Sequence, residues 1–287
     1  MPKSEADRPS VRWRVARSRP SVLAIGGFDP SGGAGILMDA RAISAAGAHP
    51  TALVTALTIQ STAGCVDVAP VDAETFRSQL EHLVSAQPPL VVKLGALGSA
   101  DIAQIVANYL AESPCLVVLD PVAAPSVHAG NAPGRPLATD DARAIVRNEI
   151  LPRGVLLCAN GMELEALSGL KVVDTTTAIA AARVVIEHGA RAVYAKSGHW
   201  PTTDANDVIV FRDTTCVLPA PRLDASDVHG TGCTLASLWA GRLAFAGDAS
   251  QGSIADAARW AKGFLFRALE SAIVVGDGQR VVRLERD

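Results

Sequence analysis

The sequence predicts a single-domain α/β protein in which helices cover both faces of a mostly parallel central sheet. Three observations indicate this three-layer α/β/α class. Short apolar runs alternate with segments of helical periodicity along almost the whole chain. Ala, Val, Leu and Gly dominate the 287 residues, of which 49% are hydrophobic and only 4% aromatic. No internal repeat or linker divides the chain, which is long enough to bury a substantial core.

Each predicted strand is a short apolar run that ends in a glycine, a proline or a polar residue. The first run, SVLAIGG, ends in two glycines, and the run CLVVLDPV is stopped by Pro121. The stretch VIVFRDTTCVLPAP is typical of a polar-flanked hairpin. The predicted strands are residues 21–27, 51–59, 90–97, 115–122, 154–160 and 191–198, followed by the hairpin at 208–221.

The predicted helices carry apolar residues along one face. In the first of them, residues 33–48, Ile36, Ala40 and Ile43 share a face and Gly47 is placed to end the helix. Parallel sheets of this kind bind ligands outside the carboxyl ends of their strands, so the residues just after each strand are the candidates for function. The other predicted helices are residues 74–86, 100–112, 140–152, 162–170, 176–190, 231–246 and 254–272.

Two segments lie outside this alternating pattern. The first twenty residues are polar and basic, which predicts a disordered tail before a folded domain at 21–287; docking of the tail onto a neighbouring subunit is the alternative. The tail lacks the apolar core of a secretory signal. The loop at 125–140 is rich in Gly, Pro and Ala, and we expect it either to be disordered or to act as a lid.

Charge and cysteine content exclude several classes of protein. The net charge of −3 favours neither a nucleic-acid partner nor a membrane surface. No apolar run reaches the roughly 20 residues of a membrane span. The five cysteines form no C-x-x-C pair, which argues against a disulfide framework or a zinc site and favours a reducing cytoplasm.

The loop after the first predicted strand, GGFDPSGGAG, is neither a P-loop nor a dinucleotide-binding fingerprint. Its glycines either let a ligand approach the backbone near Gly27 or simply form a tight turn. Asp39 in the next helix and Gln60 at the end of the second strand could together hydrogen-bond a heterocycle with adjacent donor and acceptor atoms. Each could equally be a satisfied surface or cap residue.

Charged residues follow the later strands. Asp120 ends VVLDPV, and Glu163 follows Asn160 in an N-x-x-E spacing at a helix start. Carboxylates at neighbouring strand ends could hold Mg²⁺, although a glutamate in a first turn often only complements the helix dipole. Lys196 and Gly198 in AKSGH could meet a phosphate, or the lysine could be solvated.

The stretch HGTGCT opens a predicted apolar helix. Gly230, Thr231 and Gly232 would leave free amides there, which makes an anion hole for a transferring phosphoryl group. Cys233 lies in the same first turn, where we expect its pKa to fall and its thiolate to accept a proton from a substrate hydroxyl. The alternative for this cysteine is a small buried hydrophobe.

These motifs, in this order, resemble the hydroxymethylpyrimidine/phosphomethylpyrimidine kinases of the ribokinase-like superfamily, from about Val22 to about Arg267. The resemblance implies ATP-dependent phosphorylation of 4-amino-5-hydroxymethyl-2-methylpyrimidine and of its monophosphate in thiamine biosynthesis. It also implies ATP and Mg²⁺ as cofactors and a homodimer, and the cysteine content adds a cytoplasmic location. The motifs that carry it are GGFDPSGGAG with Asp39, TALTIQST, VVLDPV, the N-x-x-E at Asn160, KSGH and HGTGCT.

The resemblance also assigns roles to individual residues. Cys233 occupies the position of the aspartate base in the superfamily's sugar kinases. The residues implied to hold the aminopyrimidine are Gly27, Asp39 and Gln60; those for magnesium and phosphates are Asp120 and Glu163; those along the ATP phosphates are Lys196, Gly198 and Thr231; and those at the transferring group are Gly230, Gly232 and Cys233.

Several positions depart from the family pattern. Leu37 stands where members usually have glutamine, Ala96 where they have methionine, and Ser197 where glycine is commoner. Loss of a methionine would enlarge a pocket, a change worth about 1–3 kcal/mol of discrimination. Two other functions therefore stay open: a pyridoxal or pyridoxine kinase of the same superfamily, and a non-catalytic binder of thiamine precursors.

Overall fold

The computed structural model describes residues 19–122, 136–198, 200, 204–225 and 227–284. They build a nine-stranded sheet in the order β3-β2-β1-β4-β5-β6-β7-β8-β9. The strands from β2 to β7 are parallel, and the outer strands β3, β8 and β9 are antiparallel to their neighbours. The strands are β1 (Ser21–Phe28), β2 (His49–Ser61), β3 (Gly64–Pro70), β4 (Val91–Leu94), β5 (Leu116–Leu119), β6 (Leu156–Asn160), β7 (Ala192–Lys196), β8 (Asp207–Val210) and β9 (Thr215–Leu218).

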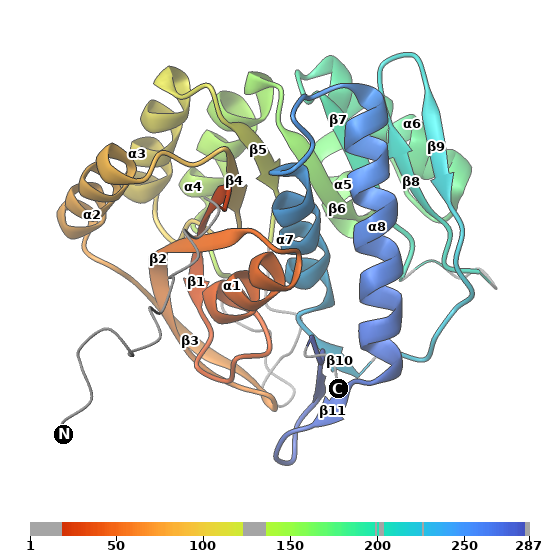
Figure 1. Cartoon of the computed structure of the whole chain (residues 1–287), viewed down its shortest axis with the longest axis horizontal. Coiled ribbons are helices and arrows are strands. Elements are labelled where there is room, and N and C mark those ends of the chain that lie inside the picture. Colours follow the sequence, from red (N-terminus) through yellow and green to blue (C-terminus); the bar gives the residue numbers. More distant parts are fainter. Residues whose placement is uncertain (1–18, 123–135, 199, 201–203, 226, 285–287) are drawn as a thin grey trace, which may run out of the picture.

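Helices cover both faces of this sheet (Figure 1). Helices α1, α7 and α8 pack on one face, and α2 to α6 pack on the other. The predicted three-layer, mostly parallel architecture is therefore confirmed. The helices are α1 (Gly35–Ala45), α2 (Ala73–Ala86), α3 (Ala100–Glu112), α4 (Asp140–Ile145), α5 (Gly161–Ser168), α6 (Thr175–Glu187), α7 (Thr231–Leu243) and α8 (Gln251–Glu270).

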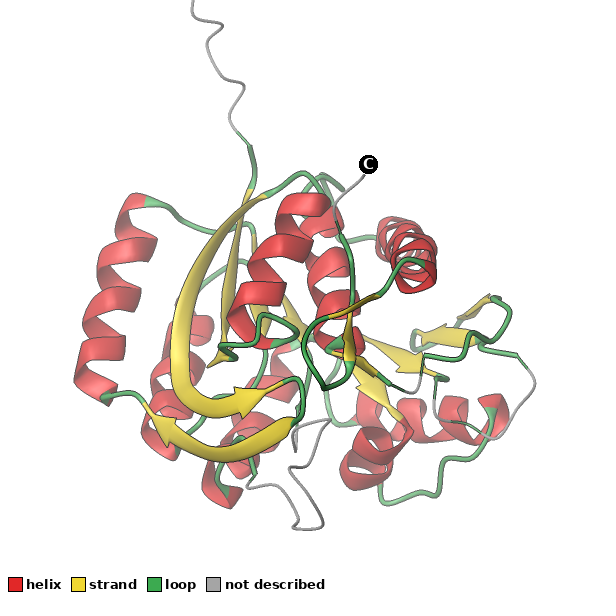
Figure 2. Ribbon diagram, turned by 90° about the horizontal axis from the view of Figure 1, so that it is seen from below, coloured by secondary structure: helices red, strands yellow, loops and turns green. Residues whose placement is uncertain are grey.

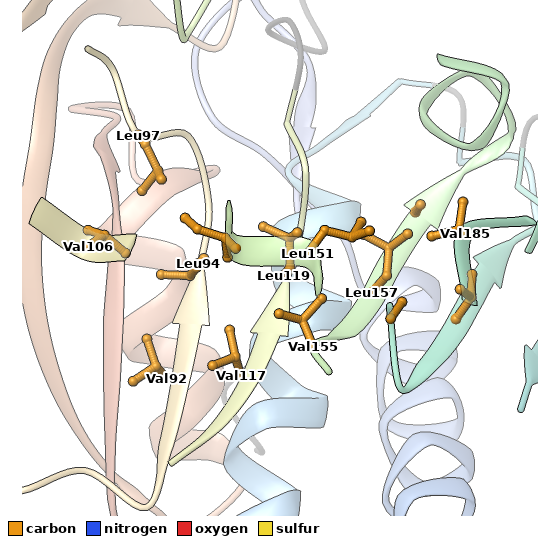
Figure 3. Packing of buried hydrophobic residues seen from close by; sticks show 14 of the residues in the cluster. Val92, Leu94, Leu97, Val106, Val117, Leu119, Leu151, Val155, Leu157 and Val185 are labelled. Atoms are coloured by element: carbon orange, nitrogen blue, oxygen red, sulfur yellow. The ribbon is translucent and has the colours of Figure 1, made fainter. Parts of the chain in front are cut away.

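Alternation along the strands divides the core into two layers. Val91 packs toward α1, α7 and α8, whereas Val92 and Leu94 pack on the other side of the sheet. Lys93, between them, therefore points toward α1 and α7. The second layer is shown in Figure 3, where the labelled side chains include Val92, Leu94, Val106, Val117, Leu119, Leu157 and Val185.

The helix starts differ in a way that bears on function. Helices α2 to α6 and α8 each begin with a side chain that accepts a hydrogen bond from a first-turn amide. Helices α1 and α7 have no such side-chain cap; α1 follows Ala34 and α7 follows Gly230. Their first amides consequently have no side-chain acceptor at the cap position, and both helices begin at the carboxyl edge of the sheet.

Three features differ from the sequence prediction. Strand β3 was not expected; β2 pairs with β1 first and with β3 from Ala56 onward, as a long curved ribbon (Figure 2). A small second sheet joins β10 (Val228–His229), β12 (Arg280–Val281) and β11 (Ile273–Val274). The predicted helix at 140–152 changes after α4 to a π turn and a 3-10 turn, and left-handed Gly154 ends it.

The two segments outside the alternating pattern remain largely untested. Residues 1–18 of the predicted tail and 125–135 of the loop at 125–140 lie outside the described residues. Among the helices of the described part, none is long and apolar enough to cross a membrane.

Candidate active site

The site residues gather where the sheet reverses its strand order. Strand β1 lies between β2 and β4. The chain leaves β1 through α1 to β2 on one side and later crosses through α2 to β4 on the other side. Open α/β sheets bind ligands at such a switch point, outside the carboxyl ends of the strands. The loop after β1 and the ends of β4, β5, β6 and β7 all lie along this edge.

Two glycine turns pack against each other at this edge. Gly230 has φ +76°, and a Cβ on it would collide with the carbonyl of Gly33. Gly35 has φ +57°, and a Cβ on it would collide with the carbonyl of Gly27. The loop after β1 and the turn before α7 can therefore approach this closely only as glycine backbone.

Asp29 fastens the first of these turns. Its carboxylate accepts hydrogen bonds from the amides of Ser31 at 2.9 Å and Ala34 at 3.0 Å. It also lies 2.8 Å from Nε2 of His229 and 3.3 Å from Nε2 of Gln60. Burial raises the pKa of Asp29, but the hydrogen bonds from His229 and Ser31 outweigh burial and hold it below its usual range. Asp29 is therefore an ionised anchor.

Three charged side chains meet at the ends of β5, β6 and β7. Nζ of Lys196 lies 3.1 Å from Oδ1 of Asp120 and 3.4 Å from Oε2 of Glu163. Burial lowers the pKa of Lys196, but the two carboxylates more than offset it and hold the pKa well above its usual value. Oδ2 of Asp120 is buried and has no hydrogen-bond partner. The cluster thus has an acceptor to spare.

Glu163 has two roles in the structure. Its Oε2 accepts the amide hydrogen of Asn160 at 2.7 Å, and its own amide donates to Oδ1 of Asn160 at 2.9 Å. This capping box starts α5, and it places Glu163 in the first helical turn, where the helix-dipole alternative also located it. Burial raises the pKa of Glu163, Lys196 lowers it, and Asp120 raises it further. The same carboxylate therefore caps a helix and faces Lys196.

The turn before α7 lies beside this cluster. A Cβ on Gly232 would be 3.2 Å from Nζ of Lys196 and 4.0 Å from Oδ1 of Asp120. Thr231 is half-buried at the start of the helix. Gly198 is exposed after β7, and its carbonyl accepts a hydrogen bond from Arg222 at 2.8 Å. The structure thus brings Lys196, Asp120 and the glycine turn together.

Cys233 is half-buried in the first turn of α7, not deep in the apolar core. Burial raises the pKa of its thiol to about 12; Lys93 opposes this rise, and Asp120 and Asp39 add to it. A backbone hydrogen bond from Gly35 lowers the pKa only in part. The prediction that this pKa falls is therefore wrong for the protein without ligands, because desolvation and two carboxylates outweigh the helix terminus.

Asp39 requires a second correction. Its carboxylate is fully buried and accepts two hydrogen bonds from Nζ of Lys93, at 2.8 and 2.9 Å. Ser237 on α7 donates a third at 2.7 Å. A ligand could reach Asp39 only by displacing Lys93 or Ser237, so the expected contact with a heterocycle is replaced by an internal ion pair.

Gln60 and Gly27 remain candidates for ligand contact. Gln60 is half-buried and bonds to Asp29 and His229, and it shares no partner with Asp39. Gly27 is also half-buried, and the nearest atom to a Cβ placed on it is the carbonyl oxygen of Ala56 at 3.8 Å. The backbone at Gly27 is therefore open to close approach.

Sequence reasoning missed three residues of this site: Asp29, Lys93 and His229. Lys93 had a visible signal, because a lone lysine inside the apolar run LVVKLGAL must be paired when the strand is buried. Asp29 and His229 flank the two glycine turns, but nothing in the spacing shows that they meet. Only the fold brings them together.

Comparisons with known proteins identify the family of the chain. The sequence matches the family Phosphomethylpyrimidine kinase over residues 29–283. It is 35% identical over 259 residues to the hydroxymethylpyrimidine/phosphomethylpyrimidine kinase of Streptomyces coelicolor, covering 90% of this chain and 92% of that protein.

Two solved structures have the same fold. Phosphomethylpyrimidine kinase from Clostridium difficile is 26% identical with a TM-score of 0.73, over 88% of this chain and all of that one (100%). Pyridoxal kinase from Staphylococcus aureus in complex with AMP-PCP is 25% identical with a TM-score of 0.82, over 93% of this chain and 94% of that one.

Proposed function

This chain belongs to the phosphomethylpyrimidine kinase family, and from that premise we propose that it transfers phosphoryl groups from ATP to 4-amino-5-hydroxymethyl-2-methylpyrimidine and then to the monophosphate. The observation that carries this proposal is the Lys196–Asp120–Glu163 cluster beside the uncapped start of α7. A half-buried cation, a free acceptor and amides without a side-chain cap at one point suit a transferring phosphoryl group.

The chain's own groups supply most of the phosphate chemistry. The amides of Thr231, Gly232 and Cys233 open α7 without a side-chain cap, and they would donate to the equatorial oxygens of the transferring group. Lys196, held protonated by its two carboxylates, would neutralise charge on the phosphates. Gly198 would border the nucleotide's phosphate chain.

A divalent cation fits the same cluster. Oδ2 of Asp120 is an orphaned, buried acceptor, and carboxylate oxygens are the ligands that Mg²⁺ takes when it also binds substrate phosphates. We assign Asp120 and Glu163 as the residues that would hold it. Within the described residues, no three His, Cys, Asp or Glu side chains cluster as a complete metal site. When bound, the ion would neutralise charge on the phosphates of ATP.

Cys233 would act on the substrate hydroxyl. With a pKa of about 12 its thiol is protonated at neutral pH in the protein without ligands. We therefore infer that Cys233 first loses its own thiol proton to solvent and then accepts the hydroxyl proton, and that a cation bound beside Asp120 would favour this loss. A loose phosphoryl-transfer transition state needs little base catalysis, so the amides and Lys196 account for more of the rate.

A pyridoxal kinase is the second candidate function. The Staphylococcus aureus pyridoxal kinase has the same fold over most of both chains. Ala96 is buried beside the end of β4, and Leu37 is 38% exposed at the start of α1. Ala96 is smaller and Leu37 is less polar than the residues usual at these positions in the family, and these differences favour a ring other than the aminopyrimidine.

The direct test is ADP release with a panel of ring substrates. The proposal predicts turnover of the aminopyrimidine and its monophosphate at a kcat/KM well above that for pyridoxal or pyridoxine. Faster turnover of pyridoxal would establish the second candidate in its place. Binding of the aminopyrimidine with no ADP release under any condition would leave a non-catalytic binder and reject both kinase functions.

We also propose that the enzyme is a homodimer. Leu57, Ile59 and Val66 of the β2–β3 ribbon are 53%, 62% and 66% exposed, and β3 is an open sheet edge. Sedimentation equilibrium should give twice the chain mass. A mass of one chain at micromolar concentration would reject the dimer.

A further inference from the structure

Three polar side chains from separate segments meet beside the first glycine turn. Asp29 follows β1, Gln60 lies in β2, and His229 lies in β10. Nε2 of His229 is 2.8 Å from Oδ2 of Asp29 and 3.0 Å from Nε2 of Gln60, and Nε2 of Gln60 is 3.3 Å from the same Oδ2. Asp29 is 3% exposed and His229 is 1% exposed, so water does not compete for these bonds.

The chemistry of Asp29 fixes which way the Gln60 amide faces. An ionised carboxylate only accepts hydrogen bonds, so the Gln60 atom beside it must be the nitrogen and not the oxygen. The same logic applies to the imidazole: Nε2 of His229 must carry a proton and donate it to Asp29. His229 therefore satisfies Asp29 and does not accept from Gln60, whose amide hydrogen is left to the carboxylate.

The carbonyl oxygen of Gln60 is consequently turned away from Asp29. None of the described residues donates a hydrogen bond to it, and Gln60 is half-buried and not sealed in the core. The loop that Asp29 holds, through the amides of Ser31 and Ala34, leads directly to Gly35, whose backbone bonds to Cys233. This loop therefore connects the Asp29 cluster, which includes Gln60, to the backbone that bonds to Cys233.

We propose that Asp29 and His229 are positioning residues: they hold Gln60, which the family resemblance already implies at the aminopyrimidine, as a fixed acceptor for the ring's amino group. The inference rests on the function proposed above and deepens it. An amino group beside the hydroxymethyl donates to Oε1 of Gln60. An aldehyde at that position, as in pyridoxal, only accepts hydrogen bonds. The aldehyde oxygen and Oε1 of Gln60 would then both lack a donor.

The test is a double-mutant cycle in which one change is made in the ligand and the other in the protein. Dissociation constants are measured by calorimetry. The two ligands are the aminopyrimidine and its desamino analogue, 5-hydroxymethyl-2-methylpyrimidine. Loss of the amino group should weaken binding to the unmodified protein about tenfold or more. The same loss should change binding less than about threefold in Gln60→Ala and in His229→Phe.

Two further variants separate positioning from general damage. The double variant Gln60→Ala/His229→Phe should bind the aminopyrimidine no more weakly than Gln60→Ala alone, because His229 acts through Gln60. His229→Gln keeps an N–H donor and should restore most of the amino preference. His188→Phe changes an exposed histidine and is the matched control, with no expected effect.

A measurement on the unmodified protein covers the case in which His229→Phe does not fold. The long-range ¹H–¹⁵N spectrum of His229 should show the proton on Nε2, and an unprotonated Nε2 would overturn the proposal. The proposal is also overturned if His229→Phe keeps the full preference for the aminopyrimidine over its desamino analogue. The same holds if the double variant loses affinity by the product of the two single-variant losses. A protein that binds no aminopyrimidine but phosphorylates pyridoxal rejects the proposed function itself.

Discussion

Two lysine–aspartate pairs lie near the carboxyl edge of the sheet, and they differ in how completely their polar atoms are satisfied. Lys93 and Asp39 are both 1% exposed; two contacts of 2.8 and 2.9 Å join them, and Ser237 adds a third bond. Lys196 is 13% exposed and reaches Asp120 by one contact of 3.1 Å, and Oδ2 of Asp120 has no partner.

The same two residue types therefore serve different purposes. The Asp39–Lys93 pair is complete and joins α1, β4 and α7, so it holds the walls of the site in place. The Asp120–Lys196 pair is incomplete and lies beside uncapped amides, so it can still bind a ligand. The two pairs contain the same residue types, but only the proposed phosphate-binding pair leaves a buried polar atom without a partner.

The largest expected effect comes from removing the cation of the incomplete pair. Lys196→Met should lower kcat/KM for ATP by about 10³–10⁵, because charge on the transferring group is no longer neutralised. Steady-state ADP release measures this. Loss of less than about tenfold in a folded variant would show that Lys196 only neutralises its own carboxylates.

Removing the cation of the complete pair should act on stability. Lys93→Met leaves Asp39 buried without its partner, so the free energy of unfolding should fall by about 3–5 kcal/mol. Urea unfolding followed by circular dichroism gives this value. A variant as stable as the unmodified protein would contradict the structural role of the pair.

A smaller loss of stability is expected when only the third bond to Asp39 is removed. Ser237→Ala takes a hydroxyl from a buried carboxylate and should lower the free energy of unfolding by about 1.5–3 kcal/mol. Its kcat and KM values should stay within about twofold of the unmodified protein. A large fall in kcat with unchanged stability would mean that Asp39 takes part in chemistry.

Charges from both pairs act on the pKa of Cys233, and the expected effect here is on thiol reactivity and not on turnover or stability. The pKa of about 12 means that the thiolate is a minor species below that pH. Alkylation of Cys233 by iodoacetamide, followed by peptide mass spectrometry, should rise about tenfold per pH unit between about pH 7 and pH 10. An alkylation rate that stops rising near neutral pH would show that the helix terminus lowers the pKa of Cys233 by more than burial and the carboxylates raise it.

The fold was largely predictable because the alternation of apolar runs and amphipathic segments is strong in this chain. The helix at Ala100–Glu112 lies where its periodicity predicts, and the structure adds the Ser99 cap. Strand β3 was missed because GCVDVAP is short and half exposed, and its pairing with β2 is antiparallel at a sheet edge. The two-residue strands of the small sheet carry no periodicity at all.

The site was predictable only in part. Spacing after the strands located Asp120, Glu163 and Lys196, because parallel strands end at the same edge. The ion pair between Asp39 and Lys93, which replaces the expected ligand contact of Asp39, was not predictable from Asp39 alone. The pair forms because the side chain of Lys93 points to the face of the sheet that α1 covers. Which face a strand residue points to depends on the alternation along the strand and on its register.

The most direct test of the account is calorimetric binding of AMP-PCP with Mg²⁺ to one variant from each pair. We predict that Lys196→Met weakens binding by about 30-fold or more, while Ser237→Ala stays within about twofold of the unmodified protein. Equal affinity in Lys196→Met and the unmodified protein would contradict the assignment of the incomplete pair as the phosphate site.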